Sequence, residues 1–309
     1  MPTLKEIKGR IGSVKSTLKI TSAMKLVASA KLRKAQKAIE AMRPYEQALQ
    51  EILAAVSVPG AQMADIAPEK VKNMVPGAGE AVSAPRPQAI VAIASNSSLC
   101  GGFNANIIAK VRSVRQPGDI VYSVGRKMAD AMRRDGFPSP KDLNDLAEHP
   151  AYGPAAELVE ALMEDVEKGR ISGVTLVYTH FVSTAKQVPV VETLIASASP
   201  AAEENYFSQG FAKNQFSSAI ASPTQTDVII EPNAKELRKE LLPKTLKLKL
   251  YAALLDSAAA EHAARTVAMQ TATDNAENLL SELTLQYNKG RQQKITSEIL
   301  DLAGGQAEQ

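Results

Sequence analysis

The sequence has few aromatic residues, no tryptophan and one cysteine. Aromatic residues make up 4% of the 309 positions, and Cys100 is the only thiol, so a disulfide within the chain is excluded. The three histidines, His149, His180 and His262, are scattered and show no metal-ligand spacing. No run approaches the roughly 18 consecutive apolar residues of a membrane helix. We therefore expect a reduced globular protein without a metal site, a cofactor or a membrane span.

Targeting signals are also scarce. The first residues, MPTLKE, lack the apolar core of a secretory signal. A basic, acid-poor N-terminus is also a feature of organelle transit peptides, but the helical pattern described next continues past any plausible cleavage point.

The net charge of +3 is small but unevenly distributed, because residues 1–37 carry ten Lys or Arg and one acid, Glu6. Apolar residues in this segment recur at alternating steps of three and four, which predicts one face of a helix. The pattern extends from about residue 3 to residue 56, which is roughly 80 Å of helix at ~1.5 Å per residue. Pro44 should kink it. A helix of this length needs a partner to cover its apolar face.

The C-terminal segment supplies that partner. Residues 244–302 contain no proline and one glycine, Gly290, and their apolar residues again follow a helical spacing. Residues 254–301 have a net charge of −3, opposite in sign to the N-terminal helix. We expect an antiparallel coiled coil whose longer C-terminal helix projects beyond its partner.

The central part of the chain predicts an α/β domain, because short apolar runs alternate with helical stretches. The expected strands are 89–94, 119–124, 173–181 and 188–196, and the expected helices are 104–115, 126–135 and 154–168. Proline and glycine punctuate 59–87, and 199–226 is a second long connection. The fold class is α/β, a long antiparallel coiled coil with an inserted Rossmann-like domain. The domains are 1–57 (N-terminal helix), 58–87 (irregular connection), 88–230 (α/β domain) and 231–309 (C-terminal helix).

One glycine-rich turn, SNSSLCGGFN at 95–104, lies between an expected strand and an expected helix. Such turns can bind phosphate or carry a nucleophile. However, Phe103 and Asn104 follow the glycines where a phosphate loop has Lys and Ser or Thr. A catalytic Cys100 would need a base, and no histidine is suitably spaced. A structural turn with Asn104 capping the helix is favoured, while an anion site and a catalytic cysteine stay open.

Three segments together resemble the gamma subunit of the F-type ATP synthase, the central rotor shaft. They are IKGRIGSVKSTLKITSAMKLVASAKLRK at 7–34, SLCGGFN at 98–104, and AARTVAMQTATDNAENLLSELTLQYNKGRQQKITSEIL at 263–300. The resemblance spans essentially the whole chain. Ser98 stands where the family often has glycine, and no paired cysteines occur at 196–230, so the thiol switch of chloroplast relatives should be absent.

The resemblance implies a non-catalytic rotor subunit, with the catalytic sites on other subunits. The implied partners are three alpha and three beta subunits, the epsilon subunit and the membrane c-ring, whose proton-driven rotation the shaft would transmit. The implied location is peripheral, on the cytoplasmic face of the bacterial inner membrane. Six residues match family positions that contact the alpha/beta ring: Met24, Lys25, Arg265, Gln292, Thr296 and Glu298. Met24 and Lys25 would meet an acidic lever of beta, and the last three a beta catch loop, while the tip at 299–309 would sit in an apolar sleeve.

Without the resemblance, other functions stay open. The basic N-terminal helix could bind nucleic acid, although its cations interleave with an apolar face and no aromatic platform accompanies them. The α/β domain could be an enzyme, or the coiled coil a generic scaffold. Met24 could equally be coil packing, His262 a packed side chain, and the polar residues of the C-terminal helix solvated.

Overall fold

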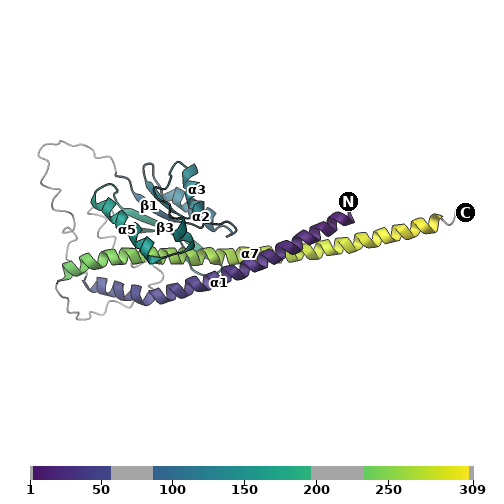
Figure 1. Ribbon diagram of the computed structural model, residues 1–309, viewed down its shortest axis with the longest axis horizontal. Coiled ribbons are helices and arrows are strands. Elements are labelled where there is room, and N and C mark those ends of the chain that lie inside the picture. Colours follow the sequence, from purple (N-terminus) through teal and green to yellow (C-terminus); the bar gives the residue numbers. More distant parts are fainter. Residues whose placement is uncertain (1–2, 57–85, 196–232, 306–309) are drawn as a thin grey trace.

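The computed structural model describes residues 3–56, 86–195 and 233–305. Two long helices dominate it: α1 (Leu4–Val56) and α7 (Ala234–Gly305), of 53 and 72 residues. They run in opposite directions, with both chain ends toward the same end of the molecule (Figure 1). The expected connection at 58–87 lies, apart from its last two residues, outside the described part, as does the second connection at 199–226.

Local sequence explains where both helices begin. At α1, the backbone N–H of Thr3 donates to the Glu6 carboxylate at 2.8 Å and that of Glu6 donates to the Thr3 hydroxyl at 3.3 Å, which is a capping box. At α7, the Asn233 side chain accepts from the Glu236 N–H at 2.8 Å. This cap starts α7 three residues inside the expected C-terminal segment 231–309, and the helix continues through Pro243. Buried Leu241 packs there on Leu49 and Leu53 of α1, which offsets the backbone hydrogen bond that proline cannot make.

The register of the coiled coil is antiparallel and continuous. A Cβ added to Gly290 would lie 3.1 Å from Leu4, and further toward the domain the Thr21 and Thr273 hydroxyls are 3.0 Å apart. The seam then continues through small and apolar residues to the base of the coil: Leu32, Ala35, Ala259 and Ala263, then Leu49, Leu53, Leu241 and Leu248. Since Leu4 at the start of α1 lies beside Gly290, residues 291–305 extend past the end of α1 (Figure 1).

The segment between the two long helices in the sequence forms a four-stranded mixed sheet in the order β2-β1-β3-β4. The strands are β1 (Ala89–Ile93), β2 (Ile120–Val124), β3 (Val174–Phe181) and β4 (Gln187–Ile195). Strand β1 is parallel to β2 and β3, and β4 returns antiparallel to β3. The four expected strands are confirmed to within a residue at each end.

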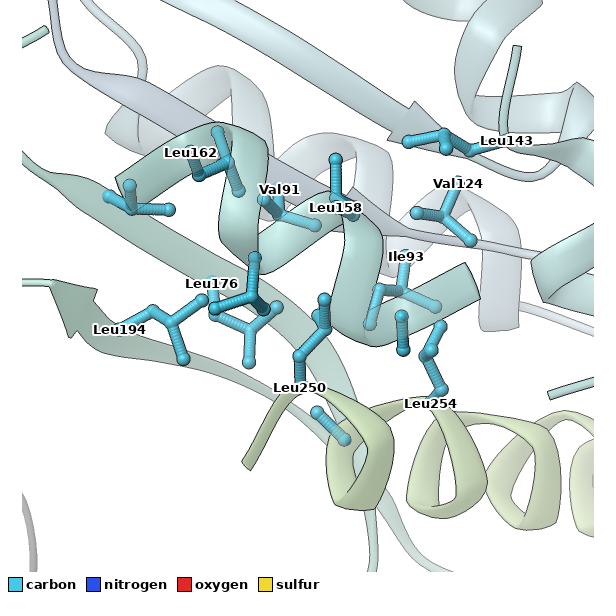
Figure 2. Close-up of a cluster of buried hydrophobic side chains, with 14 of the residues drawn as sticks. Val91, Ile93, Val124, Leu143, Leu158, Leu162, Leu176, Leu194, Leu250 and Leu254 are labelled. Carbon is cyan, nitrogen blue, oxygen red and sulfur yellow. The ribbon is translucent and has the colours of Figure 1, made fainter. Parts of the chain in front are cut away.

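Helices cover both faces of the sheet. Every residue of β1 is therefore buried, although its side chains alternate between the two faces. Ile90 and Ala92 face α2 (Phe103–Val114) and α3 (Arg126–Arg134). Val91 and Ile93 pack with α5 (Tyr152–Glu167) and with α7 through Leu250 and Leu254 (Figure 2). The short α4 (Asn144–Glu148) was not expected. The long helix α7 is thus part of both the coiled coil and the core of the domain, so the two cannot move independently without opening this core.

Among the described residues, no helix has the length and apolar character needed to cross a membrane.

Candidate interaction site on the coiled coil

Met24 and Lys25 lie at the middle of the coil, where its interior becomes polar. The Lys25 ammonium donates to the Gln270 side-chain oxygen at 2.5 Å, and the Gln270 amide donates to Asp274 at 2.6 Å. Met24 beside it is half-buried. Lys25 therefore stays half-accessible while its head group is bound to α7. Lys25 therefore stabilises the pairing of α1 with α7, and part of its side chain remains accessible.

Arg265 is placed differently from an exposed contact residue. Its side chain is 11% exposed, and its guanidinium pairs with Glu261 at 2.6 Å and donates to the Ser97 hydroxyl at 2.9 Å and the Ser98 carbonyl at 3.4 Å. Burial raises the pKa of Glu261 above its ordinary value, although Arg265 acts in the opposite direction. Arg265 thus anchors the 95–104 turn to α7.

His262 lies half-buried one turn before Thr266 on α7. Burial lowers the pKa of His262 to about 4, and the nearby positive charges of Arg265 and Lys31 act in the same direction. The imidazole is therefore neutral near pH 7 and adds no charge to this part of the coil.

The glycine-rich turn is a closed hydrogen-bonded structure around Cys100. The thiol is buried, and its contacts are the Asn104 amide at 3.1 Å, the Ser95 hydroxyl at 3.8 Å and the Ser97 carbonyl at 3.9 Å, none of which is a base. The expectation that Asn104 caps α2 is wrong, because the cap position is Gly102 and has no side-chain hydrogen bond. Asn104 instead accepts from the Ser95 N–H at 3.1 Å and hydroxyl at 2.9 Å, which closes the turn. Over the described parts of the chain, no cluster of three or more His, Cys, Asp or Glu could hold a metal.

The other three predicted contact residues lie on the bare tip of α7. Gln292, Thr296 and Glu298 are exposed, as is every residue from 291 to 300. The Thr296 hydroxyl donates to the Gln292 carbonyl at 2.9 Å, and Glu298 pairs with Lys294 at 3.7 Å. Gln292 is some 22 residues along α7 from Gln270, which is roughly 33 Å at ~1.5 Å per residue. The six predicted residues therefore form two regions, one at mid-coil and one at the tip.

Sequence reasoning missed a polar cluster where the β3–β4 hairpin meets the coil. The His180 ring contacts Asp256 at 2.6 Å, and Asp256 also accepts from the Phe181 N–H at 3.0 Å. The Tyr178 hydroxyl donates to Glu192 at 3.0 Å, and Lys249 pairs with Glu192 at 3.5 Å. The available signal was an acid, Asp256, in the apolar run LYAALLDSAAA of a helix. A buried acid requires a partner.

Comparison with known proteins identifies the family. The ATP synthase family model matches residues 3–307. The ATP synthase gamma chain of Phocaeicola vulgatus is 45% identical over 312 residues and that of Bacteroides thetaiotaomicron is 43% identical over 316, with 99% of each chain covered. The chain belongs to the ATP synthase gamma chain family. Gamma chains are central-stalk components of ATP synthase, and the catalytic sites lie on other subunits.

Solved structures agree on the fold. The rotor of the Euglena gracilis mitochondrial ATP synthase matches with a TM-score of 0.61 at 19% identity, covering 94% of this chain and 98% of that one. The central stalk and c-ring structure from Tetrahymena thermophila gives 0.52 at 22% identity, covering 82% and 99%. At this identity the likeness concerns the fold alone, and the family assignment depends on the sequence matches.

Proposed function

We propose that this gamma-family chain is the rotor shaft that transmits rotation of a membrane c-ring to an alpha/beta ring, where other subunits make or hydrolyse ATP. The observation that carries the proposal is the shape of the shaft. A paired coil continues into a single helix, 291–305, whose residues 291–300 are exposed, while a domain sharing the core of α7 occupies the other end (Figure 1). A shaft built in this way can enter a ring at its narrow end and receive torque at its wide end.

Transmission requires that different rotational positions stabilise different states of the catalytic subunits, because an element that contacts all states equally shifts none. The coil meets this requirement through its asymmetry. At the end of the shaft remote from the domain, α1 begins near Leu4, whereas α7 continues alone. At the opposite end, the α/β domain packs against α7. Each orientation would therefore present a different surface to a surrounding ring.

Charge supports contact between α1 and acidic partner surfaces. Lys5, Lys8, Arg10, Lys15 and Lys19 are all exposed on the half of α1 remote from the domain. An acidic lever on beta, which the family resemblance implies, would be attracted to this helix without a need for a fixed geometry. We assign direct contact with the ring to Met24, Lys25, Gln292, Thr296 and Glu298, and an indirect role to Arg265.

The proposed partners are three alpha and three beta subunits around the coil, and the epsilon subunit and the c-ring at the domain end. In this arrangement the chain is peripheral on the cytoplasmic face of the bacterial inner membrane. Proton flow through the membrane sector would drive the ring.

The alternatives predict different complexes. A nucleic-acid-binding protein would use the exposed cations of α1 and lose affinity steeply with salt. A coiled-coil scaffold would bind partners, but the rate of ATP turnover would not depend on the presence of the chain.

Native co-purification tests the proposal. An affinity tag is inserted within residues 57–85, membranes are solubilised gently, and co-purifying subunits are quantified along with ATPase activity; untagged membranes serve as the control. We expect three alpha and three beta subunits per chain, with epsilon and c subunits and active hydrolysis. Recovery of the chain alone, or with nucleic acid, would contradict the proposal.

A further inference from the structure

A cavity of about 190 Å³ lies where the start of α2, the β3–β4 hairpin and α7 meet. No charged side chain of the described residues lines it. A largely apolar cavity with a few convergent polar groups is the general form of a small-molecule site. Its larger apolar side chains and its polar groups are Phe103, Pro189, Val267, Asn106, Thr179 and Gln187.

The hydroxyl of Thr179 is the feature that points to a ligand. Thr179 is 3% exposed, and its Oγ1 is buried without a hydrogen-bond partner in the described part of the chain. Thr179 lies on the same face of β3 as Val177, which packs with α2, so its side chain is directed toward α2 and the cavity. Buried hydroxyls nearly always have a partner, because an unpaired one costs free energy. A ligand in the cavity would supply the missing partner.

The N-terminus of the 12-residue helix α2 borders the same cavity through Gly102 and Phe103. The cap residue, Gly102, makes no side-chain hydrogen bond, and the first turn of the helix carries no acid. The partial positive charge of the helix end is therefore not compensated by a side chain, which favours a bound anion. The exposed Asn106 adds a side-chain amide at this end, since a Cβ on Gly102 would lie 3.4 Å from its nitrogen.

The composition of the cavity selects the class of anion. A doubly charged phosphate is normally bound by Arg or Lys, and none of the described Arg or Lys residues lines the cavity. A carboxylate has a single charge, which the helix end and two hydrogen bonds can balance. An apolar cavity of about 150 Å³ accommodates benzene, so this cavity has room for a ring with a carboxylate attached.

We propose that the cavity binds a small monocarboxylate with an apolar body, of about the size of benzoate. The carboxylate accepts hydrogen bonds from the Thr179 hydroxyl and the Asn106 amide at the start of α2. The apolar body packs against Phe103, Pro189 and Val267. Because the ligand contacts α2, the β3–β4 hairpin and α7 together, its binding stabilises the joint between the domain and the shaft. This inference does not depend on the rotor function.

Benzoate binding by the full chain tests the proposal. Saturation-transfer NMR and thermal unfolding are recorded while benzoate is titrated. We expect saturable binding with a dissociation constant on the order of 1 mM, the scale for a ligand of this size, and a melting temperature that rises with benzoate concentration. Benzyl alcohol, which has the same ring and no charge, should bind at least about five times more weakly. Inorganic phosphate at the same concentration should not displace benzoate.

Substitutions in the cavity separate ligand binding from folding. Thr179→Val keeps the shape and removes an unpaired buried hydroxyl, so the melting temperature without ligand should stay the same or rise. The dissociation constant of benzoate should nevertheless increase about tenfold. Gly102→Ala should also weaken binding, because φ at Gly102 is −80°, which alanine adopts readily, and the added methyl group narrows the cavity. Thr193→Val, at an exposed threonine of β4 that does not line the cavity, is the matched control.

Four results would overturn the inference. Absence of saturable benzoate binding, or equal affinity for benzyl alcohol, would show that the cavity does not recognise a carboxylate. Displacement of benzoate by phosphate would assign the site to another class of anion. Unchanged affinity in both Thr179→Val and Gly102→Ala would place benzoate elsewhere on the chain. A lower melting temperature of ligand-free Thr179→Val would show that the hydroxyl already stabilises the fold.

Discussion

At the scale of single residues, the His180–Asp256 pair joins the sheet to the shaft. His180 is on β3, Asp256 is on α7, and their side chains are 17% and 11% exposed. The hydrogen bond to Asp256 raises the pKa of His180 above its ordinary value; burial opposes this shift, whereas the charges of Asp256 and Glu192 add to it. Because the folded-state pKa is raised, the stabilisation is complete below the unfolded-state pKa and is lost as the pH rises through the folded-state pKa.

We therefore predict that the penalty of His180→Gln depends on pH. The difference in unfolding free energy between the wild type and His180→Gln should be largest below about pH 6.5, the ordinary histidine pKa, and should shrink at higher pH. Chemical denaturation of the full chain, followed by circular dichroism at several pH values, measures this difference. His149→Gln, at an exposed histidine outside the network, is the matched control. A penalty that is constant or grows with rising pH would show that the ion pair is not its source.

Residue roles were the least predictable part of the sequence. The contact of Arg265 with the turn was not predicted, because it depends on a turn 168 positions away in sequence that folds onto α7. Its expected contact with the ring stays a prediction. Asn104 was expected to cap α2, yet it folds back to Ser95. Both depend on tertiary contacts that no local pattern encodes. Cys100 behaves as the favoured structural reading predicts, since it is buried with neutral partners.

At the scale of elements, strands were predicted well. The buried runs AIVAI and VTLVYTHF are short, apolar and bounded by turn signals, which is typical of strands. The observed start of α7 lies close to the start of the expected segment 231–309. The Asn233 cap and the packing of Leu241 on α1 allow the helix to run through Pro243. The five-residue α4 is too short to show a periodicity.

The tip of α7 leads to a prediction at this scale. Deletion of 300–309 should leave the melting temperature of the chain unchanged, because residues 291–300 are exposed and lie past the end of α1. In the complex the deletion should weaken assembly or torque, because the contact between the tip and the apolar sleeve would be lost. Thermal unfolding of the full chain and ATP synthesis by the reconstituted complex are the two measurements.

Leu283→Ala is the contrast for this deletion. Leu283 is 5% exposed within the paired coil, so its truncation should cost about 2–5 kcal/mol and lower the melting temperature. Full synthesis without 300–309 would show that the tip is dispensable for coupling.

At the scale of the whole molecule, the paired coil, the bare tip and the domain form one mechanical unit. Leu250 and Leu254 of α7 lie in the same hydrophobic core as β1, β3 and α5 (Figure 2), and Leu246 belongs to this core too. Torque applied to the domain is therefore delivered to α7 through close-packed side chains, which deform little. From α7 it passes to α1 along the antiparallel seam.

Direct observation of rotation tests the central claim. The alpha/beta ring is fixed to a surface, a bead is attached through a tag within residues 57–85, and its motion is recorded during ATP hydrolysis. We predict stepwise rotation in one direction that stops when ATP is withdrawn. Sustained hydrolysis by the complex while the bead shows only undirected Brownian motion would contradict the rotor account.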